Sequence, residues 1–431
     1  MELDRLRESL RTPVGKKAQR PLILPIASGK GGVGKTTVAV NLALALARHD
    51  RTILVDLDTG TSSVRNTIPG EVQYDLYHFL RKGRPLEECL TGIPAAFDPA
   101  GDFANFSYAA APIHFIEELV NLGTASRETL MRGINALPAR FIITDLRAGA
   151  DDSVLDFLPL ANSGLLVFTP NLPAATLAAA DLVKAGLFRK LRALFGAESP
   201  MWRRLSGQSL KPLIDDLILR VEDPYDDSIP NLDAFLADLH HALGEHPVVE
   251  ALRRALDRYR VFFVLNRFDA VTEAYDTAVK PFVESLTKYV SARLQITNLG
   301  WIIESPEVHE SNRLRRPLML GSAEPVLTPQ RRKARGNAEL ESLQAIYGGF
   351  KQQRPIAPAA SHKIPDPGPQ LAAQLDTLKM LYQSDKKLDP RQNFAYLASR
   401  VLYFADTSPV GELGDEKLFT PAEAIQALTR F

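Results

Sequence analysis

Eight consecutive residues near the start of the chain constrain its fold more than any other stretch. They read Gly29-Lys30-Gly31-Gly32-Val33-Gly34-Lys35-Thr36 and fit the pattern G-x-x-x-x-G-K-[ST] at every fixed position. Glycines let a backbone fold around an anion so that successive N–H groups point inward, and a following helix adds its positive N-terminus. Residues 22–27 read as a buried strand and residues 37–48 as a helix. Strand, loop and helix stand in the order that a phosphate-binding loop requires, so the sequence predicts a nucleotide site.

Three side chains at the end of the loop have expected roles in binding a nucleoside triphosphate with Mg²⁺. Lys35 is expected near the β- and γ-phosphates, Thr36 is expected to ligate Mg²⁺, and Thr37 is placed to touch the α-phosphate. The loop residues from Gly29 onward are expected to surround the nucleotide. Pro25 cannot donate to a sheet ladder and is unexpected in a central strand, which leaves the register of the preceding strand open.

Two further apolar runs end in carboxylates. The first leads to Asp56 and Asp58, and the second, residues 141–144, leads to Asp145. In an open parallel sheet the ligand binds beyond the carboxyl ends of the strands, where these acids would meet the phosphates. A carboxylate at that edge can orient the attacking water, and an aspartate that closes an apolar strand can hold Mg²⁺ through water. For the first pair, carboxylates that merely end a strand remain the alternative.

The loop resembles the deviant P-loop, K-G-G-V-G-K-T, of the MinD/ParA family, residue by residue from Ser28 to Thr37. In that family the lysine after the first glycine reaches across a dimer interface to the partner's nucleotide, and the resemblance implies this role for Lys30. The sequence V-D-L-D at 55–58 resembles the switch I motif of the family. This likeness implies that the second aspartate orients the water and the first supports the metal shell. The candidate catalytic residues are Lys30, Lys35 and Asp58, and the candidate metal residues are Thr36, Asp56, Asp58 and Asp145.

The residues after Asp145 continue the likeness. Leu-Arg-Ala-Gly-Ala at 146–150 resembles the switch II motif of the MinD and FlhG branch, and Gly149 can swing its amide toward a γ-phosphate. Arg147 departs from the small residue or proline usual there. It could stabilise charge in the transition state or form a surface salt bridge, and the salt bridge is the expected role.

Two later stretches resemble the parts of the family that surround the base. Asn266-Arg267 at a strand end resembles the element whose asparagine reads the adenine edge. Residues 299–317 resemble the closing stretch of the family, whose loop, here with Pro306, packs beside the base. The resemblance covers about residues 21–320, except for a helical insertion at about 188–258.

The resemblance implies an α/β fold with a doubly wound, mainly parallel sheet of the P-loop NTPase type. The insertion shows apolar residues at helical spacing and is interpreted as a partner-binding device, with core padding as an equal alternative. The remaining parts are an N-terminal arm at 1–20, a basic and proline-rich linker at 321–370 and a helical extension at 371–431. Within the extension, Asp389 is placed as a helix N-cap and Thr420 to Glu423 as a capping box.

Composition limits the function classes. The 431 residues carry a formal net charge of zero, so nothing global favours nucleic acid or an anionic membrane. No apolar run approaches the roughly 18 residues that span a bilayer, and the single cysteine, Cys89, excludes intrachain disulfides. A cytoplasmic location is expected. The basic region from Arg313 to Arg335 could dock on nonspecific DNA or an anionic membrane, at the nucleoid or the membrane periphery, although solvated charge is its expected role.

These observations predict an ATPase that closes as a homodimer around two ATP–Mg²⁺ and uses hydrolysis to control a partner or cargo. The protein partner or activator is unknown. Two alternatives use the same scaffold. A synthetase that activates a carboxylate with ATP would require a small substrate, and a reductase ATPase with an iron–sulfur cluster is disfavoured by the single cysteine.

Overall fold

The computed structural model describes most of the expected nucleotide-binding region and part of the C-terminal extension. The described residues are 21–60, 63–114, 116–117, 121–196, 199, 210–223, 228–268, 271–321, 389–407 and 413–428. The expected N-terminal arm, the linker beyond residue 321, the basic region beyond the same residue and the helical extension before residue 389 lie outside them.

The described chain forms an eight-stranded sheet with the order β3-β4-β2-β5-β1-β6-β7-β8. The strands are β1 (Leu22–Ser28), β2 (Thr52–Asp56), β3 (Leu90–Thr91), β4 (Phe106–Ala109), β5 (Phe141–Ala148), β6 (Asn162–Phe168), β7 (Arg260–Phe268) and β8 (Gln295–Ile303). Neighbours run parallel, except that the short edge strand β3 pairs antiparallel with β4. Most residues of the central strands are apolar and buried, because helices cover both faces. The predicted doubly wound α/β fold is confirmed.

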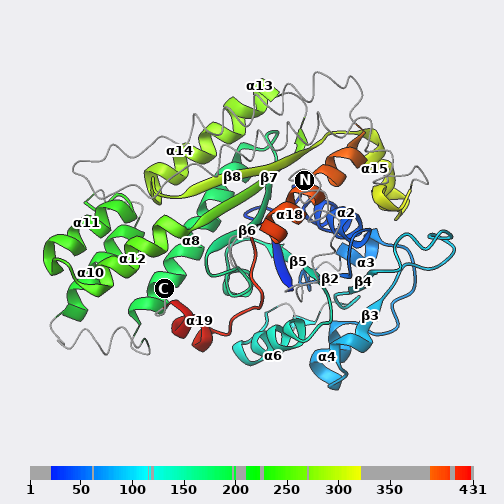
Figure 1. Ribbon diagram of the computed structural model, residues 1–431, viewed down its shortest axis with the longest axis horizontal. Coiled ribbons are helices and arrows are strands. Elements are labelled where there is room, and N and C mark those ends of the chain that lie inside the picture. The colour runs from blue at the N-terminus through cyan, green and yellow to red at the C-terminus, as the bar shows by residue number, and fades with distance from the viewer. Residues whose placement is uncertain are drawn as a thin grey trace, which may run out of the picture.

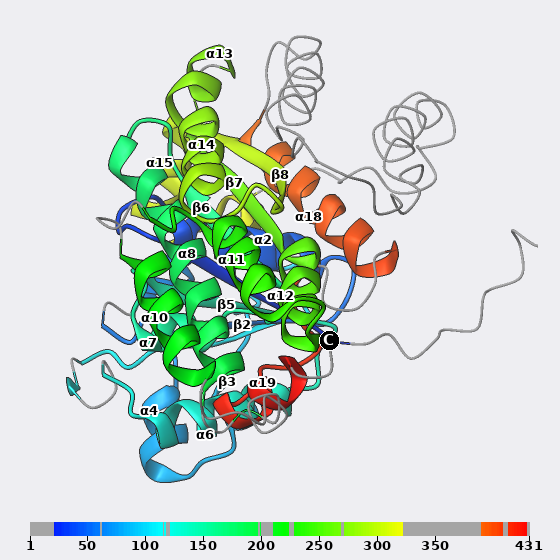
Figure 2. The ribbon, with the colours of Figure 1, turned by 90° about the vertical axis from the view of Figure 1, so that its left-hand side faces the viewer.

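Two helix layers enclose the sheet (Figures 1 and 2). On one face α2 (Lys35–Ala47) packs against α18 (Pro390–Thr407), and on the other α8 (Pro173–Phe195) packs against α14 (Lys280–Tyr289). The remaining helices are α3 (Ser63–Thr67), α4 (Leu76–Lys82), α6 (Thr124–Asn135), α7 (Asp152–Leu155), α10 (Leu210–Glu222), α11 (Leu232–Leu243), α12 (Pro247–Arg258), α13 (Val271–Ala274), α15 (Pro306–Arg313) and α19 (Pro421–Leu428), with single turns at Leu86–Cys89, Tyr275–Val279 and Leu318–Leu320. Within the described chain, no helix is both long and apolar enough to span a membrane.

Pro25 lies in the central strand β1, and the neighbouring strand accommodates it. β6 pairs with β1 only at two positions, and its register with β7 shifts between Asn162 and Leu165. Within this irregularity Gly164 has a φ of 64°, and a Cβ there would lie 2.7 Å from the Pro25 carbonyl oxygen. The Asn162 side chain accepts a hydrogen bond from the Gly164 N–H at 2.8 Å. Pro25 has no N–H to donate, and the neighbouring strand β6 is irregular at this position. The missing hydrogen bond therefore does not interrupt a regular ladder.

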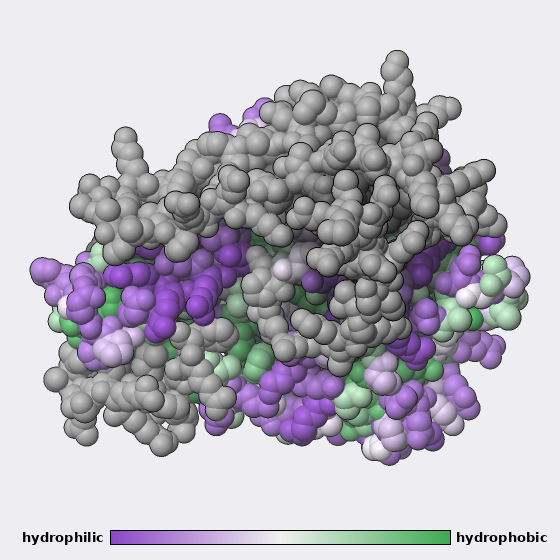
Figure 3. Space-filling model, in the orientation of Figure 1, coloured by the Kyte–Doolittle hydropathy of each residue, from purple (hydrophilic) through white to green (hydrophobic). Residues whose placement is uncertain are grey.

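The insertion consists of helices, as predicted, but it is continuous with α8. The insertion was expected to begin at about residue 188, whereas α8 continues without a break to Phe195. The extra turns persist because Leu191, Leu194 and Phe195 are buried, and the Phe195 ring packs edge-on against Phe235 of α11. The helices α10 to α12 turn their apolar sides inward. Hydrophilic residues accordingly gather over this region at the left of Figure 3.

The C-terminal part packs on the same core. Asp389 caps α18 as expected, since its carboxylate accepts the Arg391 N–H at 2.9 Å. Thr420 and Glu423 form the expected capping box at α19. Between these helices, residues 413–418, which we call the clasp, reach the start of β1. Ile23 and Asp415 exchange two backbone hydrogen bonds of 2.8 and 3.1 Å.

Candidate functional site

The phosphate loop lies between β1 and α2 at the carboxyl edge of the sheet, and two of its glycines are required by close contacts. A Cβ on Gly29 would lie 2.0 Å from the carbonyl oxygen of Ala178, in the second turn of α8. Gly34 has a φ of 84°, and a Cβ there would lie 2.2 Å from the Asn266 side-chain nitrogen. The shape of the loop is therefore fixed by contacts from α8 and β7.

The side chains of Lys35, Thr36 and Asp145 contact one another next to the phosphate loop. The Lys35 ammonium lies 2.5 Å from one oxygen of Asp145, and the Thr36 hydroxyl donates to the other oxygen at 2.6 Å. Asp145 lies within β5, three residues before its end, and is fully buried. Its oxygens and the Thr36 hydroxyl are hard ligands of the kind that Mg²⁺ takes. In the described chain no three His, Cys, Asp or Glu side chains gather into a metal cage, so a bound Mg²⁺ would need oxygens from phosphate and water.

Asp56 lies beside Asp145 in the adjacent strand and braces the segment after β2. The two aspartates are partners in the β2–β5 register. One oxygen of Asp56 accepts the Asp58 N–H at 3.1 Å, and the other accepts the Val64 N–H at 3.2 Å. Burial, with repulsion from Asp145, raises the pKa of Asp56 to about 8. Burial also raises the pKa of Asp145, although Lys35 opposes this effect. A divalent cation would stabilise the ionised form of both groups.

Two further candidates at this edge stay accessible. Asp58 follows Asp56 and is half-buried, and Lys30 is exposed on the loop. The residues described by the structure give the Lys30 ammonium no hydrogen bond or ion pair. The exposed ammonium therefore faces solvent.

The base-side residues lie at the ends of β7 and β8. The Asn266 side-chain amide donates to the Val33 carbonyl oxygen at 2.7 Å, so it also holds the phosphate loop. Arg267 has a φ of 55° and lies 4.0 Å from the Glu304 carboxylate. Pro306 is the first residue of α15, whose N-cap is Ser305.

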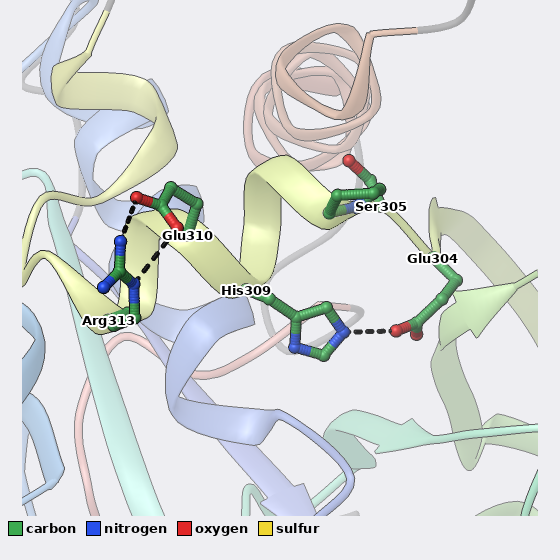
Figure 4. Close-up of a pocket in the computed structure, with 6 residues that line it drawn as sticks. Glu304, Ser305, His309, Glu310 and Arg313 are labelled. Carbon is green, nitrogen blue, oxygen red and sulfur yellow. Dashed lines mark hydrogen bonds and ion pairs between the residues drawn. The ribbon is translucent and has the colours of Figure 1, made fainter.

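Pro306 lines an open cavity of about 390 Å³ next to this end of the sheet (Figure 4). A hydrogen bond and an ion pair are visible there. His309 lies 2.5 Å from the Glu304 carboxylate, and Arg313 lies 2.6 Å from that of Glu310. These side chains come from α15 and the residue that follows β8. The cavity therefore presents charged side chains beside the predicted base position.

Sequence reasoning missed the contacts that tie the closing stretch to α2. The Asn312 side chain donates to the Thr37 hydroxyl at 3.2 Å, so the group predicted to touch the α-phosphate already has a partner. Asn41 accepts the Met319 N–H at 3.0 Å from the same stretch. Asn41 has a weak signal, because a polar residue interrupts an otherwise apolar helix, but nothing in the sequence identifies its partner.

The segment after β5 adopts a conformation that uses its glycine. Gly149 has a φ of 115°, and its N–H donates to the Ser28 carbonyl oxygen at 2.9 Å. Arg147 lies 3.6 Å from Asp151, which confirms the expected surface salt bridge. Asp151 also caps α7 by accepting the Ser153 N–H at 2.9 Å. The amide that could meet a γ-phosphate is therefore paired with the strand that leads into the phosphate loop.

Comparison with known proteins agrees with this geometry. The family model described as CobQ/CobB/MinD/ParA nucleotide binding domain matches residues 24–318. The chain is similar to the maintenance of carboxysome distribution protein A of Gloeobacter kilaueensis, 35% identical over 97 residues that cover 20% of this chain and 45% of that protein. It is also similar to the chloroplastic septum site-determining protein minD homolog of Arabidopsis thaliana, 28% identical over 162 residues that cover 36% and 48%. The chain spans about half the length of these curated relatives.

A solved structure is also similar. The septum site-determining protein MinD of Pyrococcus horikoshii, complexed with Mg-ADP, gives a TM-score of 0.40 and 15% identity. The match covers 78% of this chain and 100% of that one.

Proposed function

Because the chain belongs to the CobQ/CobB/MinD/ParA nucleotide-binding family, we propose that it is an ATP-dependent switch ATPase. In this proposal it binds ATP with Mg²⁺, closes as a homodimer and hydrolyses ATP to control the positioning or assembly of a cellular partner. The observation that carries the proposal is the convergence of Lys35, Thr36 and Asp145 within hydrogen-bond distance below an intact phosphate loop, beside an exposed Lys30. The names of the relatives, which concern carboxysome distribution and septum placement, support a positioning role.

Each side chain has a definite task in the proposed reaction. Lys35 leaves Asp145 and binds the β- and γ-phosphates, which frees Asp145 to hold Mg²⁺ together with Thr36. The metal, when bound, neutralises charge on the phosphate oxygens. Asp58 orients the attacking water from its half-buried place after β2, and Asp56 holds that segment in position. The Gly149 N–H turns from Ser28 to the γ-phosphate.

Lys30 makes the proposed site a two-subunit site. Its own nucleotide is already held by the loop backbone and Lys35, so the exposed Lys30 ammonium is useful mainly to a facing subunit. Two triphosphates that meet across an interface repel strongly at low dielectric unless cations lie between them. ATP would therefore favour the dimer, and hydrolysis would release it. We also propose that the cycle controls docking on a partner protein, or on nucleoid or membrane through the basic region.

The dimer test uses the Asp58→Ala form, which should bind ATP and hydrolyse it slowly. Light scattering should report a dimer of this form with ATP and Mg²⁺ and a monomer without nucleotide. Adding Lys30→Ala should leave ATP affinity unchanged and abolish the dimer, while Lys82→Ala, another exposed lysine, should not. A dimer that survives the loss of Lys30 would contradict the two-subunit site. It would favour the synthetase alternative, in which a small substrate stimulates ATP turnover.

A further inference from the structure

One helix, α8, touches three parts of the molecule that the proposed switch must connect. Its second turn supports the phosphate loop, because the carbonyl oxygen of Ala178 leaves no room for a side chain on Gly29. Its penultimate turn, where the insertion begins, carries Arg189, which faces α7 in the segment after β5. Its last turns form part of the helical insertion. An α-helix of 23 residues is about 34 Å long, and this one runs from the nucleotide site into the insertion.

Arg189 forms ion pairs with a carboxylate at each end of α7. One terminal nitrogen of its guanidinium lies 2.6 Å from the Asp152 carboxylate, and the other pairs with Asp156. Arg127 of α6 pairs with the second Asp156 oxygen at 2.6 Å. The Asp156 side chain is 5% exposed, so these guanidiniums compensate a nearly buried charge. A fork that holds two carboxylates on one short helix fixes the orientation of that helix as well as its distance.

The second half of α8 also contacts α10. Arg192 pairs with the Glu222 carboxylate, and the ammonium of Lys184, from the middle of α8, lies 3.5 Å from the Glu222 carbonyl oxygen. Leu191 and Leu194 are buried there. The insertion is therefore built onto the last turns of α8, and a shift or rotation of this helix must displace it.

We propose that Arg189 is a positioning residue that couples the nucleotide site to the helical insertion. The inference rests on the proposed ATP switch. A γ-phosphate oxygen competes with Ser28 for the Gly149 N–H, and α7 begins only three residues later. Arg189 passes the displacement of α7 to α8, and the contacts with Glu222 pass it to α10. The position of the insertion thereby differs between the ATP-bound and the empty protein. A protein partner that contacts the insertion would bind the two states with different affinity.

Hydrogen–deuterium exchange on the full-length chain tests the coupling, with and without Mg²⁺ and a non-hydrolysable ATP analogue. In the wild type, the analogue should slow exchange in the phosphate loop and change it by at least about fivefold in α10 to α12. In Arg189→Ala the phosphate loop should still be protected, whereas the change in the insertion should be lost. Arg189→Lys keeps the charge but lacks the two-pronged fork, so it should restore only part of the change.

The controls separate coupling from general loosening and from failure of the nucleotide site. Arg253→Ala removes an arginine whose ion pair with Glu250 lies within its own helix α12, and it should leave the nucleotide response intact. If Arg189→Ala does not fold, Asp152→Asn serves in its place. It breaks only the exposed half of the fork and should weaken the response of the insertion. The inference would be overturned if exchange in α10 to α12 did not change with nucleotide in the wild type. It would also be overturned if exchange there still changed in Arg189→Ala. An unprotected phosphate loop in the wild type would instead refute the proposed ATP site.

Discussion

Gly29 has no space for a side chain, because α8 packs directly against it. A substitution at this position therefore tests whether α8 contacts the phosphate loop in solution. Gly29→Ala would bring its Cβ to 2.0 Å from the Ala178 carbonyl oxygen, so the loop or the helix must move. We expect a loss of about 1–3 kcal/mol in the free energy of unfolding, measured by urea titration. Gly31→Ala is the matched control, because nothing lies within 4 Å of a Cβ at that position. Equal stability of the two variants would mean that the contact with α8 is not maintained in solution.

Lys35 is a second residue whose contacts make a definite prediction. Lys35→Ala should weaken ATP binding by on the order of 2–4 kcal/mol, because the charge that engages the β- and γ-phosphates is lost. The same change leaves buried Asp145 without its ammonium partner, so the variant should also unfold more easily. Isothermal titration calorimetry with ATP and Mg²⁺ measures the affinity. Unchanged affinity would place the nucleotide elsewhere, and Lys30→Ala, which should bind like the wild type, is the control.

Whole strands and helices were predictable where a pattern repeats locally. The apolar runs that end in Asp56, Asp145 and Asn266 indicated three strands of the site, and the structure confirms them. Contacts between distant segments were not predictable, because they leave no periodic trace. The pairing of Thr37 with Asn312 and the grip of Arg189 on α7 depend on how separate elements approach one another. The single residue pair that joins the clasp to β1 is too short to produce an alternating pattern.

The buried Asp415 in the clasp should make the stability of the protein depend on pH. Asp415 is buried and its carboxylate accepts the Leu160 N–H at 2.8 Å. Burial raises the pKa of Asp415 from 3.8 to about 7. Burial also lowers the pKa of Lys190 nearby to about 7, so at pH 8 this lysine is mostly neutral and compensates little. A raised pKa means that the folded protein holds a proton that the unfolded chain releases between about pH 4 and 7. The contribution of Asp415 to stability therefore falls as the pH rises through this window and stays low above it.

Asp415→Asn should remove that cost. The asparagine oxygen can still accept the Leu160 N–H, while no charge is buried at high pH. We expect the variant to be more stable than the wild type by about 1–3 kcal/mol at pH 8, with the difference vanishing near pH 4. Urea unfolding at several pH values measures it. Asp406→Asn, at an exposed carboxylate of α18, should show no such trend. A pH-independent difference at position 415 would argue against a protonated clasp.

At the scale of the whole molecule, the question is whether the C-terminal helix α18 belongs to the cooperative unit. Leu397 is 1% exposed, and α18 packs on both α2 and β8. Leu397→Ala should lower the free energy of unfolding by about 2–5 kcal/mol and shift a single transition of the entire domain. Leu219→Ala on α10, where the side chain is 60% exposed, should change it by less than about 0.5 kcal/mol. Fraying of α18 alone, with the sheet melting as before, would identify it as a separate appendage.

The hydrogen bonds between Ile23 and Asp415 join positions that lie far apart in the sequence, and this has a consequence for biosynthesis. On the ribosome, β1 emerges early, whereas the clasp is made after almost all of the other described residues. A contact between such distant positions closes a very long loop, which slows its formation. We expect the strand that leads into the phosphate loop to complete its backbone pairing only after translation has passed the clasp. The nascent chain would then carry an unfinished nucleotide site, and a newly made molecule would begin to bind nucleotide only after the clasp has been synthesised.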